Sequence, residues 1–229
     1  MIGDYPRSRD LWSSQADPVS THRYWRDRGG RTRPDRSRQT ASKIEDMNNE
    51  DMNNEDGKVE LSAQDLRVVA RYAAESAQEV LSIFEASDPG DRRPRAAVEA
   101  AWIFVEGAER TKLQRTSAFA AHAAARESTM EAARDAARAA GHAAAAAYLH
   151  PLAKSTQVRH ILGAAAHAAH AAELAAGGDR SVGAAQIEHA RQRATPALVA
   201  VLRRYPAAPS SGNRVTELMS ALDTALRSL

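Results

Sequence analysis

The sequence predicts an all-α fold: a single alanine-rich bundle of about seven helices, at residues 59–229, preceded by an N-terminal leader at residues 1–58. Three observations predict this fold. Apolar residues recur at spacings of three and four, as on one face of a helix. Alanine, the best helix former, fills most of residues 131–148 and 163–176. No stretch of the chain is a candidate strand, so the class is all-α.

The leader is predicted to be disordered, because it is polar and arginine-rich and contains Gly29-Gly30 and Arg33-Pro34. Residues 1–46 carry 10 Lys and Arg against 7 Asp and Glu, and residues 47–229 carry 21 against 22. Nucleic-acid binding needs a concentrated basic face, and the domain is nearly neutral, so nucleic acid is not an expected partner. The pentapeptide MNNED occurs twice, at 47–51 and 52–56, and Met47 and Met52 are each a candidate start, which makes residues 1–46 a possible start-site extension.

Composition excludes several classes of protein. The chain has no cysteine, hence no disulfide framework, and residues 1–9 contain no apolar signal-peptide core. The longest apolar run, 143–149, is far shorter than the roughly 20 residues that cross a bilayer. A soluble, cytoplasmic protein that contacts no membrane is expected.

The first helix is predicted to begin after Ser62, which forms a capping box with Asp65. One apolar stripe follows, and the helix ends at the turn 87–90, which contains Pro89 and Gly90. Pro94 then opens a second helix, in which Trp102 is expected to be the largest core residue. Asp91, Arg93 and Arg95 indicate an interhelix charge network or, as the alternative, a recognition surface.

A third helix is predicted at about 108–126, after a break at Gly107. It places Arg115, Phe119, His122 and Arg126 on one side, and Phe119 is expected to pack in or at the edge of the core. Ser128 or Thr129 is the expected cap of a fourth helix, at 131–148. Its small side chains predict close packing against residues 163–176.

Five of the eight histidines lie between His142 and His170. Pro151 is expected to start the helix that carries most of them, which ends at Gly177-Gly178. On that helix His160 and His167 share a face and His167 and His170 are neighbours, and they suggest two interpretations. The favoured one places the histidines at polar edges between alanine-packed helices, hydrogen-bonded to a neighbouring helix or to water. The alternative is a metal site of a helical enzyme, with the ligands His160, His167, His170 and Glu173.

The remaining chain predicts a helix capped by Ser181, a short one that starts at Thr195-Pro196, a linker at 205–212 and a last amphipathic helix that closes the bundle. No glycine-rich phosphate loop, no G-x-S-x-G and no H-E-x-x-H motif occurs. No enzymatic activity and no cofactor are therefore expected.

Four blocks of sequence carry a resemblance to a known family: DPGDRRPRAAVEAAW at 88–102, ERTKLQRTSAFAAHAAARE at 109–127, AAYLHPLAKSTQVRHILGAAAHAAHAAELAAGGD at 146–179 and IEHARQRATPALVAVLRRYPAAP at 187–209. Over about residues 60–228 the chain resembles the actinobacterial immunity protein family that has the immunity-five-like domain of polymorphic toxin systems. The resemblance implies a small helical protein that binds a cognate protein toxin in the cytoplasm and blocks it.

An immunity protein needs only a complementary surface, typically about 800 Å² per partner. Polar residues at helix starts are candidates for partner binding: Arg92, Arg93, His150, Lys154, Gln157 and Arg159. The sequence names neither the toxin nor the oligomeric state, and a homo-oligomer remains open.

Overall fold

The structure is a computed structural model that describes residues 57–210 and 212–229. The leader predicted for 1–58 therefore lies, except for its last two residues, outside the described residues. The described chain forms eight α-helices and no strand, which confirms the predicted all-α class. They are α2 (Ala63–Ser87), α3 (Arg93–Val105), α4 (Lys112–Glu127), α5 (Glu131–Ala145), α6 (Val158–Ala175), α7 (Arg180–Arg193), α8 (Pro196–Leu202) and α9 (Arg214–Arg227).

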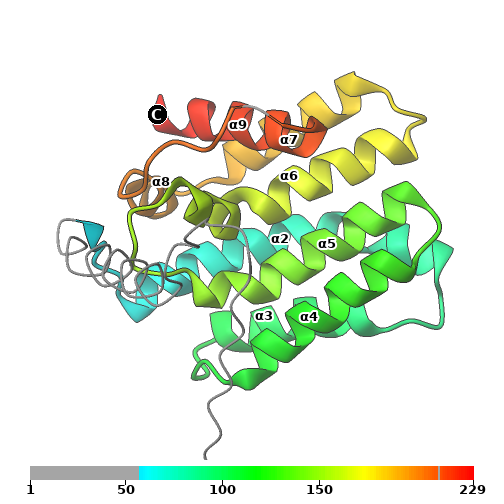
Figure 1. Cartoon of the computed structure of the whole chain (residues 1–229), viewed down its shortest axis with the longest axis horizontal. Helices are drawn as coiled ribbons and strands as arrows, with labels where there is room; N and C mark the ends of the chain where they lie inside the picture. The colour runs from blue at the N-terminus through cyan, green and yellow to red at the C-terminus, as the bar shows by residue number, and fades with distance from the viewer. Residues whose placement is uncertain (1–56, 211) are drawn as a thin grey trace, which may run out of the picture. The chain divides into compact units, whose positions relative to one another are not determined.

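Helices α3, α5, α6 and α8 pack against the long helix α2 (Figure 1). α5 contacts α2 and lies between α4 and α6, and α3 packs against α2, α4 and α5. α7 and α9 cover the other side of α6 and contact each other, while α8 packs on α2. α4, α5 and α6 run side by side, each antiparallel to the next. One face of the domain is thus built from three consecutive helices.

Helix starts follow largely from local capping; the predicted start of α4 was wrong, as were the predicted caps of α5 and α7. Ser62 and Asp65 form the predicted capping box of α2. α4 begins at Lys112 and not near residue 108, because Thr111 and Gln114 form a second capping box. α5 has no side-chain cap at Met130, and the hydroxyl of Ser128, one of its two predicted caps, donates instead to Asp88 Oδ2 at 2.9 Å. α7 is capped by Asp179 rather than by Ser181.

The start of the histidine-bearing helix was also predicted wrongly, since α6 begins at Val158 and not at Pro151. Residues 151–153 are extended and pair with the chain entering the domain: Val59 N donates to Pro151 O at 3.0 Å and Ala153 N donates to Gly57 O at 2.7 Å. The preceding helix ends at Ala145 and continues as a 3₁₀ turn over Ala146–Tyr148. A second 3₁₀ turn, Ser155–Gln157, leads into α6.

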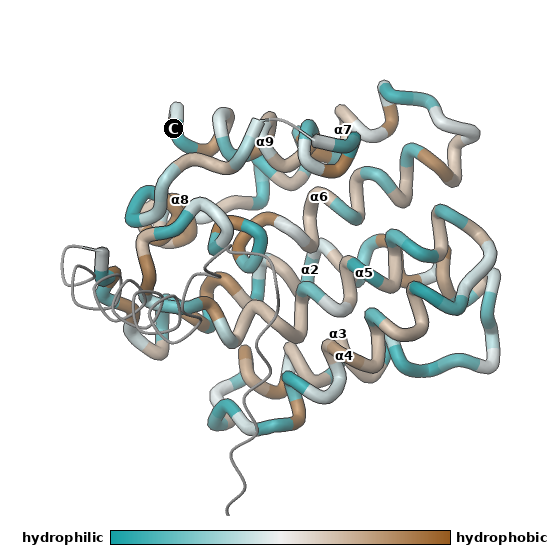
Figure 2. The backbone as a smooth tube through the Cα atoms, viewed as in Figure 1, coloured by the Kyte–Doolittle hydropathy of each residue, from teal (hydrophilic) through white to brown (hydrophobic). Residues whose placement is uncertain are grey.

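The core combines large side chains from the outer helices with alanine in the centre. The tube of α5 and α6 is mostly pale brown in Figure 2, interrupted by teal polar residues. Buried alanines make the contact between these two helices, as predicted, because side chains without a Cγ let helix axes approach closely. Trp102 was wrongly expected in the core: it is only partly buried, and its indole N–H donates to Gln78 Oε1 at 3.0 Å. The buried aromatic residues of the core are Phe84, Phe104, Tyr72 and Tyr205.

None of the helices in the described ranges combines the length and the apolar character that a membrane span requires.

Candidate functional site

A buried carboxylate on α5 organises the histidines of α6. His167 Nδ1 lies 2.7 Å from Asp135 Oδ1, and His170 Nδ1 lies 2.5 Å from Asp135 Oδ2. The spacing of three residues on α6 puts both rings over the same carboxylate. Asp135 also accepts a hydrogen bond from Arg138 at 3.1 Å, one turn along its own helix. The favoured interpretation of these two histidines, hydrogen bonding to a neighbouring helix, is confirmed.

The electrostatics of Asp135 reflect these three donors. Its side chain is almost fully buried, and burial raises the pKa of a carboxyl. The hydrogen bonds and positive charge from His167, followed by those of His170 and Arg138, oppose burial and lower the pKa to about 2. Asp135 is therefore an anion that holds two imidazole rings in fixed orientations.

A row of stacked imidazole rings continues from this cluster toward α4. The rings of His142 and His167 are stacked with centroids 5.1 Å apart, and His122 meets His142 edge-on at 5.3 Å. Burial, followed by the charge of His167, lowers the pKa of both His122 and His142. We call His122, His142, His167 and His170 the histidine row. His122 and His142 are neutral at pH 7, since their pKa values lie below the ordinary 6.5.

Two glycines make room for the histidine row. A Cβ on Gly141 would lie 2.7 Å from His122 Cε1, and a Cβ on Gly163 would lie 3.1 Å from His142 Nδ1. Real Cβ atoms are not found as close as the first distance. Glycine at these two positions of α5 and α6 therefore lets the rings sit against helix backbone.

An aromatic groove of about 240 Å³ lies beside the histidine row, between α4 and the segment that joins α5 to α6. It is lined by Arg115, Ala118, Phe119, His122, Ala145, Tyr148, His150 and His160. The Phe119 side chain is 67% exposed, which contradicts the expected core or edge position. The guanidinium groups of Arg110 and Arg115 lie over the Tyr148 ring, 5.0 and 4.7 Å from its centroid. Exposed Phe119 next to an arginine-stacked tyrosine gives this groove an open apolar surface.

The six predicted partner-binding residues fall into two groups. Arg92 and Arg93 lie at the start of α3, where Arg93 pairs with Asp91 at 2.6 Å and with Glu127 at 2.5 Å. These contacts, with a pair between Arg95 and Glu85, form the predicted interhelix charge network. The four others, His150, Lys154, Gln157 and Arg159, lie in the segment that joins α5 to α6 and in the first turn of α6, and His150 lines the aromatic groove. Only these four residues lie together, so only they form a single candidate surface for a partner. Their role in partner binding stays a prediction.

The alternative metal ligands do not converge. Glu173 is buried and binds Arg214 through both carboxylate oxygens, at 3.1 and 2.8 Å, while His167 and His170 are held by Asp135. His160 instead lines the aromatic groove. Within the described ranges, no three His, Cys, Asp or Glu side chains are placed to share one ion.

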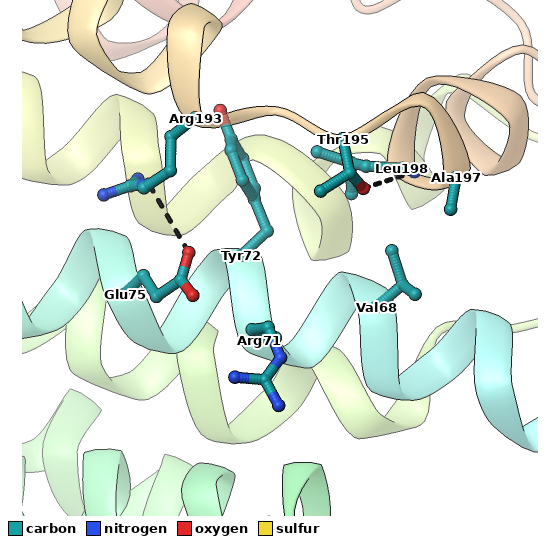
Figure 3. A pocket seen from close by; sticks show the side chains of 8 residues that line it. All are labelled: Val68, Arg71, Tyr72, Glu75, Arg193, Thr195, Ala197 and Leu198. Atoms are coloured by element: carbon teal, nitrogen blue, oxygen red, sulfur yellow. Dashed lines mark hydrogen bonds and ion pairs between the residues drawn. The ribbon is translucent and has the colours of Figure 1, made fainter.

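A further cavity, of about 410 Å³, lies between α2 and the α7–α8 connection (Figure 3). Tyr72 stands up from α2 toward that connection, and its hydroxyl donates to Ala190 O at 3.1 Å. Arg193 lies over the Tyr72 ring and donates to Ser76 Oγ at 2.7 Å, with Glu75 and Glu79 as its ion-pair partners. The polar groups here bind each other and fasten α7 to α2.

Comparison with known proteins adds the family. Residues 60–197 match the model of the family described as Imm-5 like putative immunity protein. The matched segment is more than half of the chain and contains α2 to α7, with the whole histidine row and the aromatic groove. The chain belongs to this Imm-5 like immunity protein family. Family membership confirms the resemblance seen in the sequence, and the Imm-5 like match ends before α9. Searches of curated proteins and of solved structures returned no match.

Sequence reasoning missed the most informative residues of the site. Asp135 is not among the site residues that the sequence predicted, yet Asp135, Arg138 and His142 are spaced i, i+3 and i+7 on one helical face. That spacing is the available signal, because a polar stripe within an alanine helix must meet polar groups across the interface. Nothing in the sequence around Phe119 predicts that its side chain is exposed. Its surroundings depend on the segment 146–150.

Proposed function

We propose that this protein is an immunity protein that binds a cognate protein toxin and neutralises it by surface complementarity, without catalysis. The observation that carries the proposal is the Imm-5 like family match across α2 to α7. The described residues support it in a second way, since Asp135 pairs with His167 and His170, and Glu173 pairs with Arg214.

The aromatic groove is the proposed contact surface. Residues that dominate binding energy at interfaces are mostly Trp, Tyr and Arg in the centre of the contact, surrounded by residues that exclude water. Phe119, Tyr148 and Arg115 provide two aromatic rings and a guanidinium at one opening. His150, Lys154, Gln157 and Arg159 lie near this opening as candidates for a polar rim, and a polar rim is usual around such a centre.

The test is neutralisation of a toxin in cells. The full-length chain serves as bait in its native cytoplasm, and each recovered protein is expressed in a sensitive host with and without the full-length chain. We expect one recovered protein to stop growth and co-expression to restore it. The proposal is wrong if every recovered protein is harmless or remains toxic in the presence of the chain.

Phe119→Glu tests the contact surface. We expect this variant to lose growth rescue and to bind the toxin at least about 30-fold more weakly, since a buried aromatic anchor contributes roughly 2 kcal/mol or more. Met130→Glu is the matched control, because Met130 is also exposed, at 59%, but lies outside the groove. Equal loss of rescue for the two variants would place the contact elsewhere.

A further inference from the structure

A second opening, about 180 Å³ in volume, lies where the first turn of α9 meets α5 and α6. We call it the arginine pocket. It is lined by His142, Arg159, Gly163, His167, Asn213, Val215, Thr216 and Met219. Two members of the histidine row line it, and it shares α5 and α6 with the proposed contact surface.

The polar side chains of the arginine pocket can donate hydrogen bonds, and none of its lining residues is acidic. Within residues 57–210 and 212–229, Arg159 has neither an ion-pair nor a hydrogen-bond partner, and the ring nitrogens of His142 have none. His167 uses Nδ1 for Asp135, which leaves Nε2. Asn213 accepts two bonds from Thr216 through Oδ1, which leaves its amide NH₂.

The charges around the arginine pocket favour binding of an anion. Arg159 gives the pocket a permanent positive charge, while burial lowers the pKa of the His142 ring. α9 begins at this pocket, so the positive end of its helix dipole adds a partial charge. The nearest carboxylate on α5, Asp135, is already bound by two histidines and Arg138. Arg159, the helix dipole and the free hydrogen-bond donors together suit an anionic oxygen group such as a carboxylate.

We infer that the arginine pocket binds the carboxylate of an acidic side chain presented by the toxin, with Arg159 as the charged donor and His142 beside it. The inference rests on the proposed function for the identity of the partner. Gly163 is what allows the pair to form, because a Cβ there would lie 3.1 Å from both Arg159 Cγ and His142 Nδ1. Guanidinium and carboxylate match in shape, and their charge-assisted hydrogen bonds are about twice as strong as neutral ones.

The experiment uses no toxin. A negative result would therefore reject carboxylate binding by the arginine pocket without testing whether the protein neutralises a toxin. The full-length chain, labelled with ¹⁵N in histidine, is titrated at pH 7 with acetyl-Gly-Glu-Gly-amide while the imidazole nitrogens are followed by NMR. The ligand control is acetyl-Gly-Gln-Gly-amide, which has the same shape without the charge. We expect saturable shifts of His142 and His167 with the glutamate peptide only.

Three variants complete the test. Arg159→Gln should weaken binding of the glutamate peptide at least tenfold, and Gly163→Ala, which keeps both donors but displaces them, should also weaken it. Arg126→Gln, an exposed arginine outside the pocket, should bind as the wild type does. Circular dichroism checks that each variant keeps its helices. Shifts that do not saturate, that are equal for the two peptides, or that persist in Arg159→Gln would overturn the inference.

Discussion

At the scale of single residues, Asp135 determines how α5 and α6 meet. Its carboxylate is only 3% exposed. It forms hydrogen bonds with two imidazole rings of the neighbouring helix and with one guanidinium group of its own helix. A buried carboxylate costs free energy unless it is paired, and each of its donors would in turn lose a partner without it. The histidine row depends on this residue for its orientation.

The substitution Asp135→Asn tests this dependence. The amide would keep the size of the side chain but lose the negative charge that holds His167, His170 and Arg138. We expect the free energy of unfolding in urea to fall by roughly 2–4 kcal/mol, close to the range measured when one partner of a buried pair is removed. Glu188→Gln is the control: it removes an exposed carboxylate paired with Arg191, and the free energy should hardly change.

The depressed pKa values predict how stability depends on pH. A histidine whose pKa is lowered in the folded state binds fewer protons there than in the unfolded state. Folding is therefore disfavoured as pH falls below the ordinary value of 6.5. For Asp135, lowered to about 2, the stabilisation is present above the unfolded pKa of 3.8 and is lost as pH falls toward 2. Both effects act in the same direction, so stability should decrease steadily on acidification.

His142→Gln isolates the histidine contribution. His122 from α4 and Arg159, His160 and His167 from α6 face this ring, and none of them is acidic. We expect the free energy of unfolding of the variant to fall less steeply between pH 7 and pH 5 than that of the wild type. Parallel curves over this range would show that His142 protonates as easily in the folded protein as in the unfolded one.

At the scale of elements, a buried ion pair joins α9 to α6. Arg214, the first residue of α9, binds Glu173 near the end of α6, and α7 passes over the pair at Gly183. A Cβ on Gly183 would overlap Glu173 Oε2. Glycine at this position of α7 therefore lets three helices converge on one ion pair.

Gly183→Ala should destabilise the domain although alanine favours helix. The helix propensity gained is about 1 kcal/mol. Displacing Glu173 from Arg214 costs roughly 3–5 kcal/mol, so we expect a net loss of about 2–4 kcal/mol in the free energy of unfolding. Gly90→Ala is the control, since no atom lies within 4 Å of a Cβ at that turn. A stabilised Gly183→Ala protein would mean that α7 shifts without cost.

At the scale of the whole described domain, charge indicates the kind of partner. Residues 57–229 carry 21 basic and 18 acidic residues, and the arginine pocket and the aromatic groove contain no acidic residue among those that line them. An inhibitor that mimics nucleic acid to block a nuclease would present a negative surface. We therefore propose that these two openings complement an acidic surface on the toxin, and such complementarity accelerates association at low salt.

Metal removal tests the domain as a unit. Asp135 binds His167 and His170, and Glu173 binds Arg214, so we expect EDTA to leave the thermal unfolding midpoint of the full-length chain unchanged. Metal analysis of the same sample before and after chelation is the accompanying measurement. A midpoint lowered by several degrees, together with released stoichiometric metal, would instead favour the metal-binding alternative.

By itself the sequence determined the features that depend on local physics. The all-α class, the capping box at Ser62, the close alanine contact between α5 and α6, and the family all follow from residue order, because propensity, capping and periodicity act over a few residues. The predicted start of a helix was wrong where a local sequence signal competed with a contact to a distant part of the chain. Pro151 pairs with the chain at Gly57–Val59 instead of opening a helix.

Only the tertiary structure decided which side chains meet. Asp135 and His170 are 35 residues apart, and nothing in either neighbourhood predicts their 2.5 Å contact. Phe119 is exposed and Trp102 half-buried because the segments packed beside them, and not their own hydrophobicity, set their environment. Burial and pairing are properties of two surfaces in contact, whereas a helical pattern describes only one of them.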